Sequence, residues 1–201
     1  TGVECDAFVD SLSITVYYSG PADSWTGTVY TDDDESQTIA DDTSVCAVVN
    51  NGTPACSTTT SGVFTINTLG ADAGDQLTFF IDGGSILGNT VTVSDGGDIA
   101  SGDNLRIYQN HVLVRDEQGT GIDITEMDAY DNDQNPDDML FDAEDLATDT
   151  LSVESNIELF VYNSHIFTPG GTVTTTGTGN FQVDDNATAY LDTSGSNIGN
   201  N

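Results

Sequence analysis

Short runs in which apolar and polar residues alternate dominate this chain. The clearest run places Leu12, Ile14, Val16 and Tyr18 between serine, threonine and tyrosine residues, which is the pattern of a half-buried β-strand. Similar runs occupy Thr26 to Tyr30, Val45 to Val49, Val63 to Asn67, Leu77 to Asp82, Thr90 to Ser94, Leu105 to Arg115, Leu151 to Val153, Ile157 to Tyr162, Thr172 to Thr175, Phe181 to Val183 and Ala187 to Asp192. No segment shows a helical stripe, and residues 137–146 are expected to form one short helical turn at most. Many short strands separated by Gly, Asn and Asp clusters predict an all-β protein, either a sandwich or a solenoid.

A glycine- and aspartate-rich run from Asp95 to Asp103 divides the chain into two halves. We expect an antiparallel β-sandwich of the Ig-like or prealbumin-like type in the first half. The second half is expected to be another β-rich sandwich or a solenoid-like domain that carries a dense acidic loop. The predicted organisation is an N-terminal strand and hinge over residues 1–24, a sandwich module over 25–96, a second β-rich domain over 97–193 and a flexible tail over 194–201.

The charge of the chain excludes several classes of partner. It has 34 acidic residues, two arginines and no lysine, which gives a net charge of −32. Such a surface repels nucleic acid and anionic lipid headgroups, since both are bound mainly through basic side chains. No run of 18 apolar residues is present, so no membrane span is predicted. The acids are 27 Asp and seven Glu, and Asp favours turns and calcium sites. A solvated acidic coat and bound cations both remain open as explanations.

The strongest candidate for a cation site is an acidic loop between residues 131 and 142. Its oxygen-bearing side chains follow the spacing with which one loop surrounds a calcium ion. The predicted ligands are Asp131, Asp133, Asn135, Asp137 and Asp142. Pro136 stands where an EF-hand requires glycine, so we predict a structural calcium loop that is not an EF-hand. The alternative is a solvated acidic turn, and residues 32–34 and 41–42 are further candidates.

Two of the three cysteines flank a predicted hairpin. Cys46 and Cys56 lie on either side of the Asn51-Gly52 turn, and a hairpin with this turn would bring them onto neighbouring strands. We predict a disulfide, which implies an oxidising compartment. The alternative is two buried free thiols, and Cys5 has no obvious partner.

The first half resembles a carboxypeptidase-regulatory or collagen-adhesin B-type module over roughly residues 26–94. The segments that carry the resemblance are Gly27 to Asp32, Thr58 to Ile66 and Gly74 to Gly83, which match the pattern of a strand, a Thr-x-x-x-Gly-x-Phe-x-Ile run and a Gly-Asp-x-Leu run. The whole chain is also similar to long repetitive surface proteins of bacteria, in which an acidic loop precedes a run such as Ile157 to Val173. This resemblance implies secretion to the cell surface or the extracellular space, modular repetition and no catalysis.

The absence of lysine is a departure from that family. Adhesin modules of this type often carry a Lys–Asn isopeptide bond, and sortase-built pili also need lysine. Neither cross-link can form in this chain, so any polymer would depend on strand pairing, packing, cations or disulfides.

Signals for catalysis are poor. The chain has no Gly-x-Ser-x-Gly motif and no Cys-x-x-Cys pair, and pairs of carboxylates carry no information among so many acids. His111 and His165 are lone histidines that we interpret as packed or surface residues. We therefore expect a protein that is not an enzyme.

Two further features are compatible with glycans. Asn51 and Asn186 lie in Asn-x-Thr sequons, so both are candidates for glycosylation; a chance match in an Asn- and Thr-rich chain is the alternative. Trp25 and the tyrosines near it would form either a sugar-binding platform or part of the core, and aromatic residues in strands favour the core.

The leading functional hypothesis is a structural subunit of an extracellular filament or surface stalk. Protomers are expected to join head to tail as a homopolymer, with Ser11 to Tyr18 as the strand that one copy inserts into the next. The alternative for this segment is an ordinary first strand paired within its own chain. The alternative function is a monomeric adhesin or carbohydrate-binding module within a larger secreted protein.

Overall fold

The structure is a computed structural model that describes residues 24–67, 69–96, 105–144, 149–190 and 198–200. The prediction of an all-β protein is confirmed. The strands of the first half are β1 (Ser24–Tyr30), β2 (Ser44–Val49), β3 (Ala55–Thr58), β4 (Val63–Asn67), β5 (Gln76–Ile81) and β6 (Asn89–Val93). Those of the second half are β7 (Leu105–Tyr108), β8 (His111–Asp116), β9 (Phe141–Glu144), β10 (Thr150–Val153), β11 (Glu158–Val161), β12 (Ile166–Phe167), β13 (Thr172–Thr175), β14 (Asn180–Val183), β15 (Thr188–Ala189) and β16 (Ile198–Asn200).

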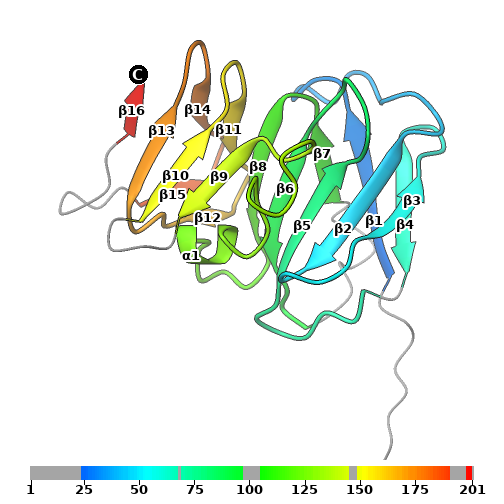
Figure 1. Ribbon diagram of the computed structural model, residues 1–201, viewed down its shortest axis with the longest axis horizontal. Helices are drawn as coiled ribbons and strands as arrows, with labels where there is room; N and C mark the ends of the chain where they lie inside the picture. Colours follow the sequence, from blue (N-terminus) through cyan, green and yellow to red (C-terminus); the bar gives the residue numbers. More distant parts are fainter. Residues whose placement is uncertain (1–23, 68, 97–104, 145–148, 191–197, 201) are drawn as a thin grey trace, which may run out of the picture.

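One seven-stranded sheet runs through both halves of the chain, in the order β14-β11-β8-β6-β5-β2-β3. Its pairs are antiparallel from β3 to β6 and parallel from β6 to β14. Figure 1 shows this sheet extending along the long axis of the molecule. The domain boundary at residues 96–97 stays a prediction, and the strands on its two sides belong to the same sheet.

The two faces of this sheet are covered by different partners. On one face, alternate residues of β2 and β5, among them Val45 and Phe79, pack against Trp25 and Phe64 of the three-stranded sheet β4-β1-β7. On the other face, the intervening residues of the same strands, among them Phe80, pack beneath the acidic loop and β9. Alternate residues of β2 and β5 therefore belong to two different cores, one on each face of a single sheet.

Three parallel strand pairs of the second half, which winds as a coil, share one sequence offset, whereas β13 and β16 pair at an offset of 25 residues. The parallel pairs Thr150↔Thr172, Glu158↔Asn180 and Ile166↔Thr188 each join residues 22 apart. The pairs β10–β13, β11–β14 and β12–β15 thus repeat in successive turns, and each pair belongs to a different sheet. Parallel pairing between successive turns is the arrangement of a solenoid, and a separate second domain stays a prediction.

The only helix among the described residues is α1 (Ile124–Met127). The helical turn expected over residues 137–146 is absent from their described part, 137–144, which forms a turn and then β9. A capping box explains where the helix forms. The Asp123 carboxylate accepts a hydrogen bond from the Glu126 backbone N–H, and the Glu126 carboxylate accepts one from the Asp123 backbone N–H; each bond satisfies a donor at the helix start. The later segment instead forms β9, because it pairs with β10.

The coil requires glycine where successive turns touch. A Cβ atom at Gly171 would lie 2.2 Å from the backbone oxygen of Asp149, a clash with backbone that a rotamer change cannot relieve. The Asp149 oxygen accepts the backbone N–H of Thr172 at this point, so backbone movement would disturb the pairing between turns.

We predict that Gly171→Ala lowers the free energy of unfolding by about 1–3 kcal/mol, the usual cost of overpacking. Gly84→Ala is the matched control, because its nearest contact would be 3.6 Å. Urea unfolding of both variants measures the difference, and equal stabilities would contradict the close approach of the two turns.

Candidate functional site

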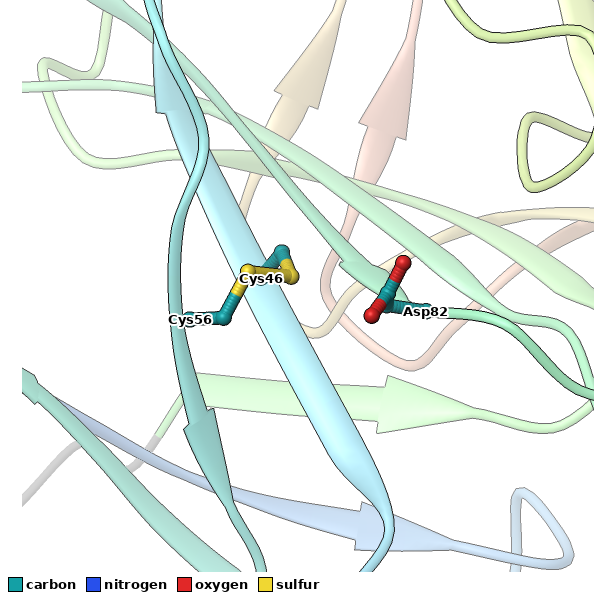
Figure 2. A group of neighbouring side chains, drawn as sticks. All are labelled: Cys46, Cys56 and Asp82. Carbon is teal, nitrogen blue, oxygen red and sulfur yellow. A yellow bond between two sulfur atoms is a disulfide. The ribbon is translucent and has the colours of Figure 1, made fainter.

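The cysteine pair lies where the sequence predicted it. Cys46 and Cys56 are opposite each other on β2 and β3 and form a disulfide. Figure 2 shows the carboxylate of Asp82 beside this bond. The three residues also place ligand-type atoms within 4.8 Å of one another, but the sulfur atoms are bonded to each other. In this oxidised state the group offers no thiolate to a metal ion.

The acidic loop is a compact turn organised around Asp131. This side chain is 1% exposed, and its two oxygens accept backbone N–H groups from Asp133 at 2.9 Å and from Ala143 at 2.6 Å. The first bond closes a local turn, and the second ties that turn to β9. The residue spacing that suggested calcium ligation therefore also serves the folding of the loop.

Other side chains fasten the loop to the seven-stranded sheet. Asn89, fully buried in β6, donates to the backbone oxygen of Asp138 at 3.0 Å and accepts from the Leu140 N–H at 2.7 Å. The Asp138 carboxylate accepts the backbone N–H of Gly83 at 3.0 Å and the side-chain amide of Asn135 at 3.0 Å. The loop thus covers one face of the sheet in a fixed position.

The five predicted calcium ligands are not brought together as a ready cluster of carboxylates. Asp133 and Asp137 are exposed, and Asn135 is engaged with Asp138. Within the part of the chain that the structure describes, neither group of three close metal-ligand atoms contains a residue of this loop. The calcium site stays a prediction, and it would require Asp133 and Asp137 to turn toward the ion.

Carboxylates of the loop repel one another. Burial raises the pKa of Asp131 to about 6, and the carboxylates of Asp142 and Asp128 add to this shift by repulsion. One buried oxygen of Asp142 has no hydrogen-bond partner among the described residues. A cation beside these two carboxylates would relieve both the repulsion and the missing contact.

The predicted glycosylation sites are accessible. Asn51 is exposed in the turn between β2 and β3, and Asn186 is exposed in the turn between β14 and β15. Modification of either residue remains a prediction. The predicted assembly strand Ser11 to Tyr18, with its Leu12, Ile14, Val16 and Tyr18 face, lies outside the described residues.

Trp25 belongs to the core and not to an exposed sugar-binding platform. Its side chain is 1% exposed, and its ring lies 5.6 Å from that of Phe79 between the two sheets of the sandwich. Burial of such a large side chain stabilises the sandwich.

The sequence did not predict where the two arginines would meet. The guanidinium groups of Arg106 and Arg115 lie 5.2 and 5.6 Å from the centre of the Tyr162 ring. Arg106 forms an ion pair with Glu35, and the fully buried Arg115 forms one with Glu117. We call these five residues the arginine junction. The junction connects the loop after β1 with strands β7 and β8 and with the end of β11. Both arginines of the chain therefore lie at one contact between its two halves.

The chain was compared with protein-family models, with curated protein sequences and with solved structures, and none of these comparisons found a match. Among the described residues, no helix has the length and apolar character needed to cross a membrane.

The raised pKa of Asp131 predicts a pH dependence of stability. The folded chain holds a proton here that the unfolded chain, with a pKa near 3.8, has already released. The free energy of unfolding should therefore fall as pH rises from about 4 to about 6, by about 2–3 kcal/mol from this residue. Urea unfolding across this range should show a smaller fall in Asp131→Asn than in the wild type. Asp72→Asn, at an exposed position, should follow the wild type.

Calcium should stabilise the acidic loop. Excess chelator is expected to lower the melting temperature by several degrees if the ion contributes even a few kcal/mol. Asp142→Asn should remove most of this calcium response, and Asp72→Asn should keep it. An identical melting curve with and without chelator, together with no ion in the loop, would reject the site.

Proposed function

We propose that this chain is a structural subunit of an extracellular filament or surface stalk, assembled non-covalently by strand exchange and stabilised by cations. The observation that carries the proposal is that the strands at the two ends of the seven-stranded sheet have no further strand partner among the described residues. Its terminal strands are β3 and β14, and they lie at opposite ends of the long axis in Figure 1. An edge strand presents unpaired backbone groups that bind another strand.

The edge at β3 borders a groove suited to an added strand. The groove has a volume of about 580 Å³ and lies between the edges of the two sheets of the sandwich. It is lined by Ser44, Ala55, Cys56, Ser57, Thr58, Thr65, Ile66 and Asn67. The proposed occupant is the segment Ser11 to Tyr18 of a second copy, whose alternating apolar residues would enter the groove while its backbone pairs with β3 or β4.

The opposite end presents a different surface. Val183, at the end of β14, is 39% exposed and Tyr190, beyond β15, is 60% exposed. Because the two ends differ, a contact between them would be heterologous, and repetition of such a contact extends a filament without closing a dimer. The resemblance to surface-protein modules, the disulfide and the net charge of −32 support an extracellular setting with cations as counterions.

The assembly is tested by placing a charge in the groove. Ser57 is opposite Val45 and therefore faces the interior of the sandwich at its open edge, whereas Thr58 is opposite Ser44 and is exposed. Ser57→Lys should prevent strand addition, because an inward-pointing charge blocks an edge. Because Thr58 also lines the groove, the control with the same charge is Thr120→Lys, at an exposed position outside it.

We expect filaments of the wild type and of Thr120→Lys in negative-stain microscopy, and dispersed particles of Ser57→Lys and of a chain lacking residues 1–19. Filaments that survive the deletion would reject strand exchange. Dispersed wild-type particles that bind glycans would instead favour a monomeric adhesin or carbohydrate-binding module.

A further inference from the structure

A second cluster of polar side chains lies where the loop after β1 crosses the seven-stranded sheet. Asp33, His111 and Glu158 each contribute one ligand-type atom, and these three atoms lie within 4.8 Å of one another. His111 begins β8 and Glu158 begins β11, and the two residues are directly paired in the parallel ladder. Paired residues of a ladder project from the same face, so the strand register holds the imidazole and the carboxylate side by side.

The loop that carries Asp33 is anchored on both sides of this residue. The Asp32 carboxylate accepts the backbone N–H of Ser36 at 2.8 Å and its hydroxyl at 2.6 Å. Glu35 pairs with Arg106 in the arginine junction and accepts the Tyr108 hydroxyl at 2.8 Å. Asp33 itself is exposed, so its carboxylate is held near the sheet and remains accessible to an ion from solvent.

The His111 ring is oriented as metal-binding histidines are. Its Nδ1 lies 2.6 Å from the backbone oxygen of Gln109, and a carbonyl oxygen only accepts, so Nδ1 carries the proton. Nε2 then presents its lone pair in the neutral ring. Edge contacts with Tyr108 at 5.7 Å and Phe160 at 6.2 Å hold the ring plane in place.

Glu158 supplies an independent observation. Its Oε1 is buried and has no hydrogen-bond partner in the described part of the chain. A buried carboxylate oxygen without a partner is costly, and the usual remedy is a basic side chain. This chain has no lysine, and its two arginines pair with Glu35 and Glu117. A metal ion is a cation that could meet this oxygen.

We propose that Asp33, His111 and Glu158 bind a divalent transition metal ion, with Zn²⁺ as the ion that this ligand set suits best. One imidazole nitrogen and two carboxylate oxygens are typical of zinc, whereas calcium and magnesium prefer oxygen alone. Tetrahedral zinc with bonds of about 2.0 Å places its ligand atoms roughly 3.3 Å apart. The side chains would close by at most about 1.5 Å from their present limit of 4.8 Å, with water in the fourth position.

The ion would connect three segments that are distant in the sequence. Asp33 belongs to the loop after β1, and the other two ligands belong to adjacent strands of the seven-stranded sheet. Zinc would therefore cross-link the sandwich to the coil next to the arginine junction. This inference concerns the single chain and does not depend on the proposed assembly.

The test is a calorimetric titration of Zn²⁺ into the full chain in excess Ca²⁺, which occupies the many oxygen-only sites. Cys5→Ser serves as the background, so that no free thiol competes. We expect one zinc site, weakened at least about tenfold in His111→Gln and in Glu158→Gln. His165→Gln is the matched control, because it removes the other histidine of the chain and should leave the affinity unchanged.

Two further measurements keep the result independent of folding defects. Asp33→Asn changes an exposed loop residue, should keep the wild-type circular dichroism spectrum and should also weaken zinc binding. Zinc should shift the NMR signals of the His111 ring and leave those of His165 in place. Absence of zinc binding in the presence of calcium, equal affinity of His111→Gln and the wild type, or loss of the site in His165→Gln would each overturn the proposal.

Discussion

The parallel pairing of β6 with β8 is the contact on which the rest of the structure depends. It joins the antiparallel strands of the first half to the parallel strands of the second half in one hydrogen-bonded sheet. Because side chains alternate between the two faces of every strand, this sheet requires a cover on each side. The three-stranded sheet β4-β1-β7 supplies one cover, and the acidic loop with β9 supplies the other. Loss of the β6–β8 pairing would expose a strand edge on each half and divide the core beneath the acidic loop, to which both strands contribute. The arginine junction and the three residues proposed to bind zinc reinforce this connection on one face, and the contacts of Asn89 with the loop reinforce it on the other.

A net charge of −32 is compatible with folding because the carboxylates are used in two ways. Many accept hydrogen bonds from backbone N–H groups in turns, as Asp131 and Asp116 do. These bonds satisfy backbone donors of the loops that would otherwise need water. The arginines are concentrated at one place, where their charges are desolvated and paired, and there they contribute more than isolated surface pairs would. What remains is a surface of unpaired carboxylates whose mutual repulsion depends on counterions. The proposed cation binding and the structural use of aspartate would therefore be complementary consequences of the same composition.

The sequence predicted the strands well and their partners poorly. Period-two patterns located most strands, since burial on one or both faces leaves a local signal. The run from Leu105 to Arg115 was predicted as one strand, but Asn110 adopts a φ of 60° and divides it into β7 and β8 in different sheets. The Asn51-Gly52 turn correctly indicated the disulfide, because hairpin partners are near in sequence. The pairing of His111 with Glu158 left no such signal, since a parallel ladder joins residues that are far apart along the chain. For the same reason the sequence analysis interpreted His111 as a packed or surface residue. The spacing of acids within one loop was the best local evidence for a metal site.

Three strand pairs of the coil share an offset of 22 residues, and β13 pairs with β16 at an offset of 25, so successive turns stack with nearly equal lengths. Each added turn of the same length lengthens the stack by the spacing of neighbouring strands, about 4.8 Å, while the cross-section stays the same. An insertion that keeps the strand positions is accommodated when it packs on the coil, as the segment between β8 and β10 illustrates: its α1 and β9 cover one face of the seven-stranded sheet. Variation in the number of turns would therefore change reach, and variation at the corners would change surface chemistry, so that evolution could adjust the two properties separately.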